Sequence, residues 1–422
     1  GLMVQDETYQ NAIRWNDVRQ NGHHGIYIQG SENLVHGNIV SGNGETGIEL
    51  YYADSNKVTG NKIGTSETGT LPDPNGEYGI VINSGEYNVI GGADATARNL
   101  IAGNEWGGVW NSGYGNEITG NYIGTREDGA GYLRNLGPGV KIDGGGANYV
   151  HDNLISGNQG FGVEVDWDGV DTNYIRNNLI GTDKSSAVAL PNLKGGVGVN
   201  HNTVIKGNTI SGNQGAGVTL TGNGNRVIDN RIGTDKYGHQ ALGNSADGLL
   251  ITGSKNTVAD NVVSGNGECG VRLYTFDAGV RENKIIDNHI GRNPDGRNLG
   301  NTLDGIYITG ASGNVIASNK IWFNCRGIRE TKANNTLINN DIQYNTCNTG
   351  IHLDEAGGEI VGNVIRNDAS DAIHCENGAD PDIYKNHITA NQGDGILSAG
   401  DADPLIYDNN ILANSGYGVR NV

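Results

Sequence analysis

The chain repeats one short pattern of apolar and polar positions along most of its length. The unit reads Asn-x-Val, a turn, Asn-x-Ile, a polar loop and then Gly-Ile-x-Ile. Apolar residues alternate with a period of two within each piece, which is typical of short β-strands with one buried face. Copies of the Gly-Ile-x-Ile piece begin at Gly25, Gly47, Gly79, Gly108, Gly139, Gly162, Gly196, Gly217, Gly248, Gly270, Gly305, Gly327, Gly350, Ala372, Gly395 and Gly418. The pattern therefore predicts about sixteen units of two or three strands each.

The spacing between copies gives a basic unit of about 22 residues, which is too small to bury a core alone. Stacking such units as coils buries one continuous column of Ile, Val and Leu. Five units are longer, and their extra residues lie near 64–78, 124–138, 181–195, 233–247 and 290–304.

An asparagine stands two residues before an Ile, Val or Leu in every unit. We expect these side chains to point inward at a tight turn, where asparagine tolerates the left-handed conformation. Stacked asparagines can hydrogen-bond to the coils above and below, as in other stacked β structures. The sixteen positions are Asn16, Asn38, Asn61, Asn99, Asn121, Asn153, Asn178, Asn208, Asn230, Asn261, Asn288, Asn319, Asn340, Asn363, Asn386 and Asn409.

With these motifs the chain resembles the right-handed parallel β-helix proteins of the pectin-lyase-like superfamily, and its repeat is most similar to NosD-type repeats. The resemblance implies an all-β fold, with one right-handed parallel β-helix (a solenoid) of about 16 coils spanning 1–422 as a single domain. It also places the inserts at the third turn, beside the first parallel sheet. There they would wall a groove like the polysaccharide clefts of the superfamily, or would be duplicated decoration.

The superfamily includes lyases, hydrolases, epimerases, phage tailspikes and adhesins, so the fold leaves the activity open. The Asp-Pro-His signature of alginate epimerases and the Asn-Thr-Asp and Gly-His-Gly pattern of polygalacturonases are missing from this sequence.

Composition supports the same architecture. Glycine accounts for 70 of 422 residues and proline for only 7, which excludes a helical protein and a collagen. The net charge of −19 disfavours nucleic acid and anionic membranes as partners, and no run of 18 apolar residues predicts a membrane span. We expect a secreted, extracellular or cell-surface protein, with flanking domains or a homo-oligomer covering the open ends of the coil.

Four cysteines are few for a chain of this length. Cys325 and Cys347 stand at equivalent points of neighbouring units, so a disulfide between stacked coils is possible. Cys375 falls on an inward position and is expected to be a buried thiol.

Outward positions of the Gly-Ile-x-Ile strands carry a first candidate site. Lys141 and Asp143 stack on Glu164 and Asp166 of the next coil. Strand geometry puts Asp143 about 4.8 Å from Asp166 and Glu164 about 6.7 Å from Asp166 at the backbone. Such spacings suit the carboxyl pairs of retaining and inverting glycosidases, although a surface ion pair with acidic turn residues is the plainer alternative.

Other residues surround these carboxylates. Asp166, Asp168 and Asp171 form an acidic run that could bind Ca²⁺. Aromatic and basic side chains on the same outward rows could contact a saccharide, and these are Trp110, Trp167, Tyr51, Tyr274, Tyr307 and Arg272.

A second candidate site lies further along the chain. Arg329, His352 and His374 form one outward column with Asp354 beside it, and histidine beside arginine and carboxylate can abstract protons. Glu330 falls on an inward position, where Arg326 is the nearest candidate partner. A solvated charge ladder is the alternative interpretation.

The sequence favours a carbohydrate-active enzyme, first a glycoside hydrolase using Asp143, Asp166 and Glu164 with Lys141 nearby. The second hypothesis is a calcium-assisted lyase or epimerase on a uronate polymer. The third is a non-catalytic glycan-binding or adhesin-like rod. No other cofactor is required by any of the three.

Overall fold

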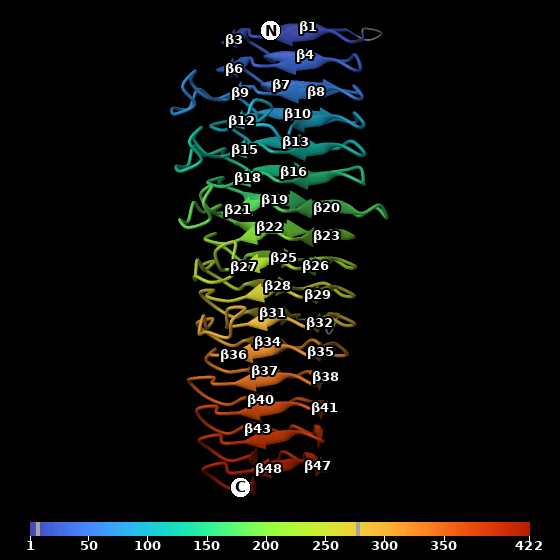
Figure 1. Ribbon diagram of the computed structural model, residues 1–422. Coiled ribbons are helices and arrows are strands. Elements are labelled where there is room, and N and C mark those ends of the chain that lie inside the picture. Colours follow the sequence, from blue (N-terminus) through green and yellow to red (C-terminus); the bar gives the residue numbers. More distant parts are fainter. Residues whose placement is uncertain (6–8, 276–278) are drawn as a thin grey trace. The chain divides into compact units, whose positions relative to one another are not determined.

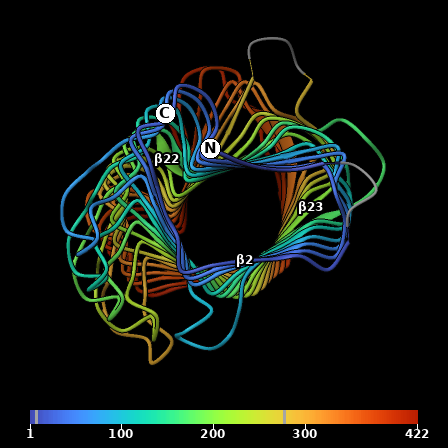
Figure 2. The ribbon, with the colours of Figure 1, turned by 90° about the horizontal axis from the view of Figure 1, so that it is seen from above.

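The computed structural model describes residues 1–5, 9–275 and 279–422, which form two compact units, Gly1–Gly215 and Ala216–Val422. Within each unit the chain winds through three parallel sheets in turn, one short strand per sheet and coil, as Figures 1 and 2 show. The described residues contain no helix, and none long and apolar enough to cross a membrane. Each unit is therefore a right-handed parallel β-helix, which confirms the predicted fold class. The single domain over 1–422 stays a prediction.

Unit 1 contains eight described strands in each sheet. The first sheet comprises β1 (Leu2–Val4), β4 (Ile26–Ile28), β7 (Ile48–Tyr51), β10 (Ile80–Asn83), β13 (Val109–Asn111), β16 (Val140–Ile142), β19 (Phe161–Val165) and β22 (Gly195–Val199). The second comprises β2 (Ala12–Arg14), β5 (Leu34–His36), β8 (Lys57–Thr59), β11 (Val89–Gly91), β14 (Glu117–Thr119), β17 (Tyr149–His151), β20 (Asn173–Arg176) and β23 (Thr203–Lys206). The third comprises β3 (Asp17–Arg19), β6 (Ile39–Ser41), β9 (Lys62–Ile63), β12 (Leu100–Ile101), β15 (Tyr122–Ile123), β18 (Leu154–Ile155), β21 (Leu179–Ile180) and β24 (Thr209–Ile210).

Unit 2 repeats this arrangement. Its first sheet comprises β25 (Val218–Leu220), β28 (Leu249–Ile251), β31 (Val271–Tyr274), β34 (Ile306–Thr309), β37 (Ile328–Thr331), β40 (Ile351–Asp354), β43 (Ile373–Glu376), β46 (Ile396–Ser398) and β49 (Val419–Asn421). The second comprises β26 (Arg226–Ile228), β29 (Thr257–Ala259), β32 (Lys284–Ile286), β35 (Val315–Ala317), β38 (Asn334–Ile338), β41 (Gly357–Val361), β44 (Asp382–Tyr384) and β47 (Leu405–Tyr407). The third comprises β27 (Arg231–Ile232), β30 (Val262–Val263), β33 (His289–Ile290), β36 (Lys320–Trp322), β39 (Asp341–Gln343), β42 (Val364–Arg366), β45 (His387–Thr389) and β48 (Asn410–Leu412).

The core of each unit is a column of aliphatic side chains. Ile26, Ile48 and Ile80 pair in register on β4, β7 and β10, and all three are 0% exposed. Their neighbours along the strands point outward, so each coil contributes one side chain to a straight outward row. The period-two pattern of the sequence therefore determines both the core and the surface rows.

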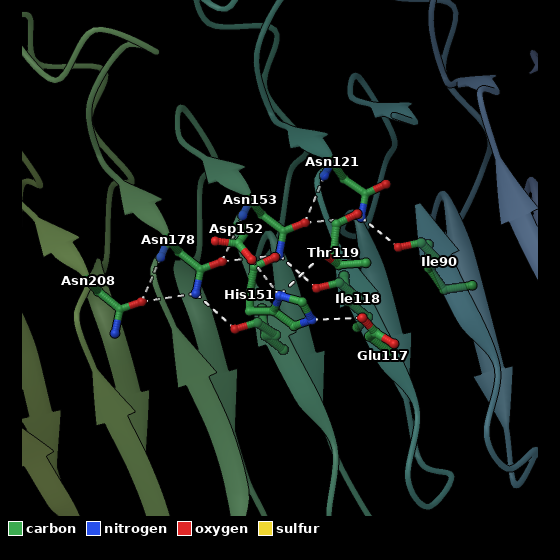
Figure 3. A network of polar contacts seen from close by, with 11 residues as sticks. Ile90, Glu117, Ile118, Thr119, Asn121, His151, Asp152, Asn153, Asn178 and Asn208 are labelled. Carbon is green, nitrogen blue, oxygen red and sulfur yellow. Dashed lines mark hydrogen bonds and ion pairs between the residues drawn. The ribbon is translucent and has the colours of Figure 1, made fainter. Parts of the chain in front are cut away.

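Asparagines stack at all three turns between sheets. Figure 3 shows part of the second-turn ladder, where Asn121 Nδ2 donates to Asn153 Oδ1 at 3.1 Å and Asn153 Nδ2 donates to Asn178 Oδ1 at 3.1 Å. Asn153 Nδ2 also donates to the carbonyl of Ile118 at 2.8 Å. The predicted ladder is thus confirmed within each unit, and sequence patterns revealed only one of three.

The turn conformation differs from the expectation. The left-handed residue is the one before the ladder asparagine, as at Asp152 (φ 56°) and Asn177 (φ 53°), and not the asparagine itself. The preceding residue makes the sharp turn, which leaves the asparagine side chain free to point along the stack.

The five inserts connect third-sheet strands to first-sheet strands, as predicted, and each is closed by an antiparallel bridge such as Thr65 to Pro72. They do not wall the first sheet alone, because their tips fold back over the third sheet. Lys62 Nζ on β9 donates to the carbonyl of Glu67 at 2.7 Å and lies 2.7 Å from Glu127 Oε2 of the next insert. The loop tips also stack, with Glu127 N donating to Gly69 O at 3.2 Å.

All four cysteines are free thiols. Cys347 N donates to Cys325 O at 3.0 Å, so these residues are neighbours on adjacent coils but form no disulfide in the structure. Cys375 is 0% exposed, as predicted, and burial raises the pKa of its thiol to about 12.

Glu330 occupies a core position on β37 where the registered neighbours are Ile308 and Leu353, and it is 0% exposed. Asn335 Nδ2 donates to Glu330 Oε1 at 3.0 Å, while Oε2 is buried without a hydrogen-bond partner in the described part of the chain. Arg326 does not pair with it, because Arg326 Nη1 lies 3.4 Å from Asp304 Oδ1 instead. Burial raises the pKa of Glu330 to about 8.

Asp368 replaces an asparagine in the third-turn ladder. Asn345 Nδ2 donates to Asp368 Oδ1 at 2.9 Å, but Asp368 Oδ2 is buried without a partner among the described residues. An asparagine at the next rung, Asn391, uses the corresponding Nδ2 to donate to Asn414 Oδ1 at 2.9 Å and to Ile365 O at 3.2 Å. Burial raises the pKa of Asp368 to about 7, so its side chain is mostly a neutral acid below that pH.

We predict that Asp368→Asn stabilises the protein, because an amide at this rung has two acceptors that a carboxylate repels. The raised pKa of Asp368 contributes stability that is fully present below about pH 4 and is lost as the pH rises through about 7. Each pKa unit is worth roughly 1.4 kcal/mol, so the gain amounts to a few kcal/mol at pH 8 and nearly vanishes at pH 4. Thermal unfolding at both pH values measures it, with the exposed Asp380→Asn as control. An equal or lower melting temperature at pH 8 contradicts the assignment.

Glu330→Gln is expected to stabilise the protein at high pH in the same way. The folded-state pKa of Glu330 of about 8 lies above its unfolded value, so stability falls as the pH rises from about 4.5 to 8. The substitution keeps the acceptor for Asn335 and removes the ionisation. The melting temperature should therefore fall less steeply with pH between 5 and 9 in the variant than in the unchanged protein. An equally steep fall in both proteins refutes the prediction.

Candidate functional site

Two outward parts of the first sheet carry clustered polar chemistry, one in each unit. We call Tyr78, Trp110, Lys141, Asp143 and Glu164 the carboxylate face of unit 1. We call Arg329, His352, Asp371, His374 and Glu376 the histidine face of unit 2.

The carboxylate face is positioned by β13, β16 and β19. Trp110, Lys141 and Glu164 stand in one registered row. Asp143 follows β16, and its Oδ2 accepts from Trp110 Nε1 at 3.2 Å and lies 3.5 Å from Lys141 Nζ. Glu164 Oε1 lies 3.5 Å from Lys194 Nζ, so each carboxylate has an ammonium group nearby.

Both carboxylates affect the pKa of Tyr78. Burial raises the pKa of the Tyr78 phenol, and the charges of Glu164 and Asp143 raise it further. Its ring lies over the backbone of Gly107, where an added Cβ would fall 2.5 Å from Tyr78 Cε1. Only glycine at position 107 leaves room for the Tyr78 ring in this position.

Asp166, Asp168 and Asp171, the predicted calcium ligands, follow β19. Asp166 Oδ1 accepts from Asn200 Nδ2 at 2.7 Å, and Asp168 Oδ1 lies 3.0 Å from His201 Nδ1. Among the described residues no three His, Cys, Asp or Glu side chains form a group that could hold a metal ion, so Asp166, Asp168 and Asp171 do not form the expected ligand set. The loop after β19 points Asp166 and Asp168 to separate partners on the next coil.

The predicted saccharide-binding aromatics of unit 1 divide into two groups. Trp110 lies at the carboxylate face, whereas Trp167 folds back over its own loop, with Nε1 buried and unpaired in the described structure. Tyr51 stacks with Tyr27 at 6.0 Å and meets Tyr52 edge-on at 4.7 Å, so it forms a separate aromatic group.

Sequence analysis missed the environment of Glu49, which is only 9% exposed on its outward row. Burial raises the pKa of Glu49, opposed by His24, whose Nε2 lies 3.2 Å away. The buried, histidine-paired state depends on side chains of neighbouring coils, and no local motif signals it.

The histidine face is the column that the sequence predicted. Arg329 on β37, His352 on β40 and His374 on β43 are in register, and the two imidazoles stack at 5.3 Å. Glu330 does not belong to it, because its side chain lies inside the coil. Asp354 is at its margin, where its Oδ1 accepts from Asn377 Nδ2 at 2.8 Å.

The pKa values of the two histidines are shifted in opposite directions. Burial lowers the pKa of His352, although its Nε2 lies 2.9 Å from Glu376 Oε1. A hydrogen bond to Asp371 raises the pKa of His374, whose Nδ1 is 3.5 Å from Asp371 Oδ2. The lowered pKa favours the neutral, basic form of His352, and the raised pKa favours the protonated, acidic form of His374. Glu376 lies beside the histidines, as the sequence predicts, whereas Asp371 was not among the candidate residues.

Arg329 supplies a positive charge to this face. Within the described residues it forms no ion pair, and its Nε is buried without a hydrogen-bond partner, as are Thr331 Oγ1 and His352 Nδ1. Its guanidinium lies 4.9 Å from the centre of the Tyr307 ring.

Two residues predicted to bind substrate, Tyr307 and Arg272, contact other side chains of the protein. The Tyr307 ring also has the Arg272 guanidinium over it at 5.7 Å, and Arg272 Nε is 3.0 Å from Asp247 Oδ2. Arg272 and Tyr307 thus have internal partners, which makes them poor contacts for a saccharide. Tyr274 lies on β31 in the second outward row, in register with Thr309.

Comparison with known proteins identifies the family. The family described as periplasmic copper-binding protein (NosD) matches residues 1–133 and 234–367, and the right-handed β-helix region matches residues 73–232 and 326–421. No curated protein matches.

Solved structures show a likeness of fold only. The Dettilon tailspike protein is 15% identical with a TM-score of 0.43, over 81% of this chain and 62% of that chain, so this chain spans less than two thirds of it. The Azotobacter vinelandii mannuronan C-5 epimerase AlgE4 A-module is 15% identical with a TM-score of 0.46, over 82% and 91%. The periplasmic alginate epimerase AlgG is 12% identical with a TM-score of 0.38, over 94% and 76%.

Each family match covers more than half of the chain, and the matched segments carry the three-sheet coil and its asparagine turns. The chain therefore belongs to the right-handed β-helix proteins of the NosD family.

Proposed function

We propose that this protein is a carbohydrate-active enzyme that hydrolyses a polysaccharide at the carboxylate face, with Asp143 and Glu164 as the reacting groups. One observation supports this most: carboxylates from neighbouring coils both raise the pKa of Tyr78, and one of them, Asp143, accepts a hydrogen bond from Trp110. Aromatic rings beside paired carboxylates are suited to hold a sugar and to cleave its glycosidic bond.

The spacing of the two residues favours inversion. Asp143 and Glu164 differ by one coil and two strand positions, which separates their backbones by about 8 Å. Inverting glycosidases place their carboxyl groups about 6.5–9.5 Å apart, so that a water molecule fits on the far side of the sugar. One group protonates the leaving oxygen while the other removes a proton from this water.

Asp143→Asn and Glu164→Gln should each lower the release of reducing ends from the cleaved polysaccharide by about 10²–10⁴-fold, as expected for loss of a general acid or base. The assay is a polysaccharide panel with and without calcium. Asp168→Asn is the matched control, because that carboxylate is exposed and bonded to His201. Unchanged hydrolysis in both variants contradicts the assignment.

A second candidate is a lyase or epimerase acting on a uronate at the histidine face. The opposite pKa shifts of His352 and His374 favour it, together with the unpaired Arg329 that would face the uronate carboxylate. His352 would take the proton from the carbon beside the carboxylate. His374 would protonate the leaving oxygen in elimination, or the opposite face of the sugar in epimerisation.

This candidate predicts ultraviolet-absorbing unsaturated products or a changed uronate composition, lost in His352→Gln and His374→Gln. Activity should fall below the lowered pKa of His352, where the base becomes protonated, and above the raised pKa of His374, where the acid is lost. His387→Gln is the control, because His387 lies on the third sheet. A pH profile unaltered in both variants counts against the histidine face.

Binding without catalysis is the outcome if glycans bind and no product forms on any polymer, and this would make the protein an adhesin-like rod. We place the protein outside the cytoplasm, at the surface or in the periplasm, which the family description supports.

Copper binding, which the family description names, is not proposed for this chain. Copper sites use clustered imidazole and sulfur ligands. The chain has one methionine, and residues 1–5, 9–275 and 279–422 contain no group of three His, Cys, Asp or Glu that could hold a metal ion.

A further inference from the structure

A cavity of about 270 Å³ lies at the second turn and over the third sheet of unit 1, and none of its lining residues belongs to the carboxylate face. Its lining includes Trp15, His36, Lys62, Arg98, Tyr122 and Glu127. No role follows for these residues from hydrolysis at the first sheet.

Two loops bound this cavity. The connection from β11 to β12 has eight residues, 92–99, whereas the connection from β8 to β9 has only Gly60 and Asn61. The longer loop, which projects outside the coil in Figure 2, is fixed to the preceding coil because Gly60 N donates to Ala97 O at 3.0 Å. The insert carrying Glu127 bounds the cavity from the other side.

Trp15 provides an exposed aromatic surface at the cavity. Its ring packs on the backbone of Gly37 (φ 70°), where an added Cβ would fall 2.4 Å from the indole, and it meets His36 edge-on at 4.9 Å. Even so, the residue is 74% exposed. A fixed, solvent-facing indole is a good surface for the apolar face of a sugar ring.

Arg98 provides an unpaired positive charge. Its guanidinium lies 4.1 Å from the centre of the Tyr122 ring, and its Nε is buried with no hydrogen-bond partner in the described residues. The other two charged groups neutralise each other, because Lys62 Nζ lies 2.7 Å from Glu127 Oε2. The charged lining therefore sums to one positive charge, in a protein whose net charge is −19.

We propose that this cavity binds a sugar ring that carries a carboxylate, with the ring on Trp15 and the carboxylate on Arg98. The cavity volume is close to the lower end of ligand pockets, about 300 Å³, which suits one such ring. The site holds the acidic sugar without reacting with it. It does not depend on catalysis at either face, so it can fail or hold independently of the proposed function.

The test is calorimetric titration with D-glucuronate, with D-glucose and sodium sulfate titrated in parallel, and tryptophan fluorescence as a second readout. We expect glucuronate to bind at least 10-fold more tightly than glucose. Trp15→Ala and Arg98→Gln should each weaken it at least 10-fold, while Arg98→Lys retains part of the affinity. A glucuronate-containing oligosaccharide distinguishes a unit within a chain from the free sugar, and binding of either supports the site.

Controls separate this site from folding defects and from the first sheet. Arg366→Gln and Tyr237→Ala remove comparable exposed side chains of unit 2 and should leave glucuronate affinity unchanged. Asp143→Asn should retain glucuronate binding even if it lowers hydrolysis as proposed. Binding that survives both Trp15→Ala and Arg98→Gln overturns the proposal, as does sulfate binding equal to that of glucuronate, or no glucuronate binding at all.

Discussion

The hydrogen bond between stacked asparagine side chains is the interaction on which each unit depends. Each coil turns three times, and every turn buries backbone groups that need partners. The ladder amide satisfies both donors and acceptors of the backbone. Asn153 Nδ2 donates to the carbonyl of Ile118, while Asn153 Oδ1 accepts from Asn121 N at 2.9 Å. An amide is both donor and acceptor, so it can repeat indefinitely along the axis, and a carboxylate cannot.

That repetition is what makes a surface site possible on so regular a scaffold. Because the ladders hold every coil in register, an outward residue always lies beside its equivalents on the next coils. A candidate site forms where side chains of different chemical type stand on successive coils of one outward row. Examples are the rows of Trp110, Lys141 and Glu164, and of Arg329, His352 and His374. Loops add contacts above the flat sheets. The 92–99 connection is one case, because together with the insert carrying Glu127 it bounds a cavity lined by Trp15 and Arg98.

The sequence was sufficient for whatever follows from periodicity. The alternation of apolar residues predicted the core, the position of each insert and the histidine column. It could not predict hydrogen bonds between side chains of neighbouring coils, such as the one that Asp166 Oδ1 accepts from Asn200 Nδ2. It also could not reveal contacts between loops and sheets, because the fold of the inserts over the third sheet depends on pairs such as Lys62 and Glu127, which are 65 residues apart.

Two carboxyl groups lie inside the coils, where a charged group is costly. Glu330 and Asp368 both lie in unit 2, and each leaves one oxygen unpaired among the described residues. Both lie on coils that also contribute to the histidine face, Glu330 beside Arg329 on β37 and Asp368 shortly before β43, which carries His374. Below their raised pKa values, about 7 for Asp368 and about 8 for Glu330, these interior acids are neutral and add no charge beneath Arg329 and His374. In that pH range the electrostatics of the face are determined by Asp371, Glu376 and the outward cations.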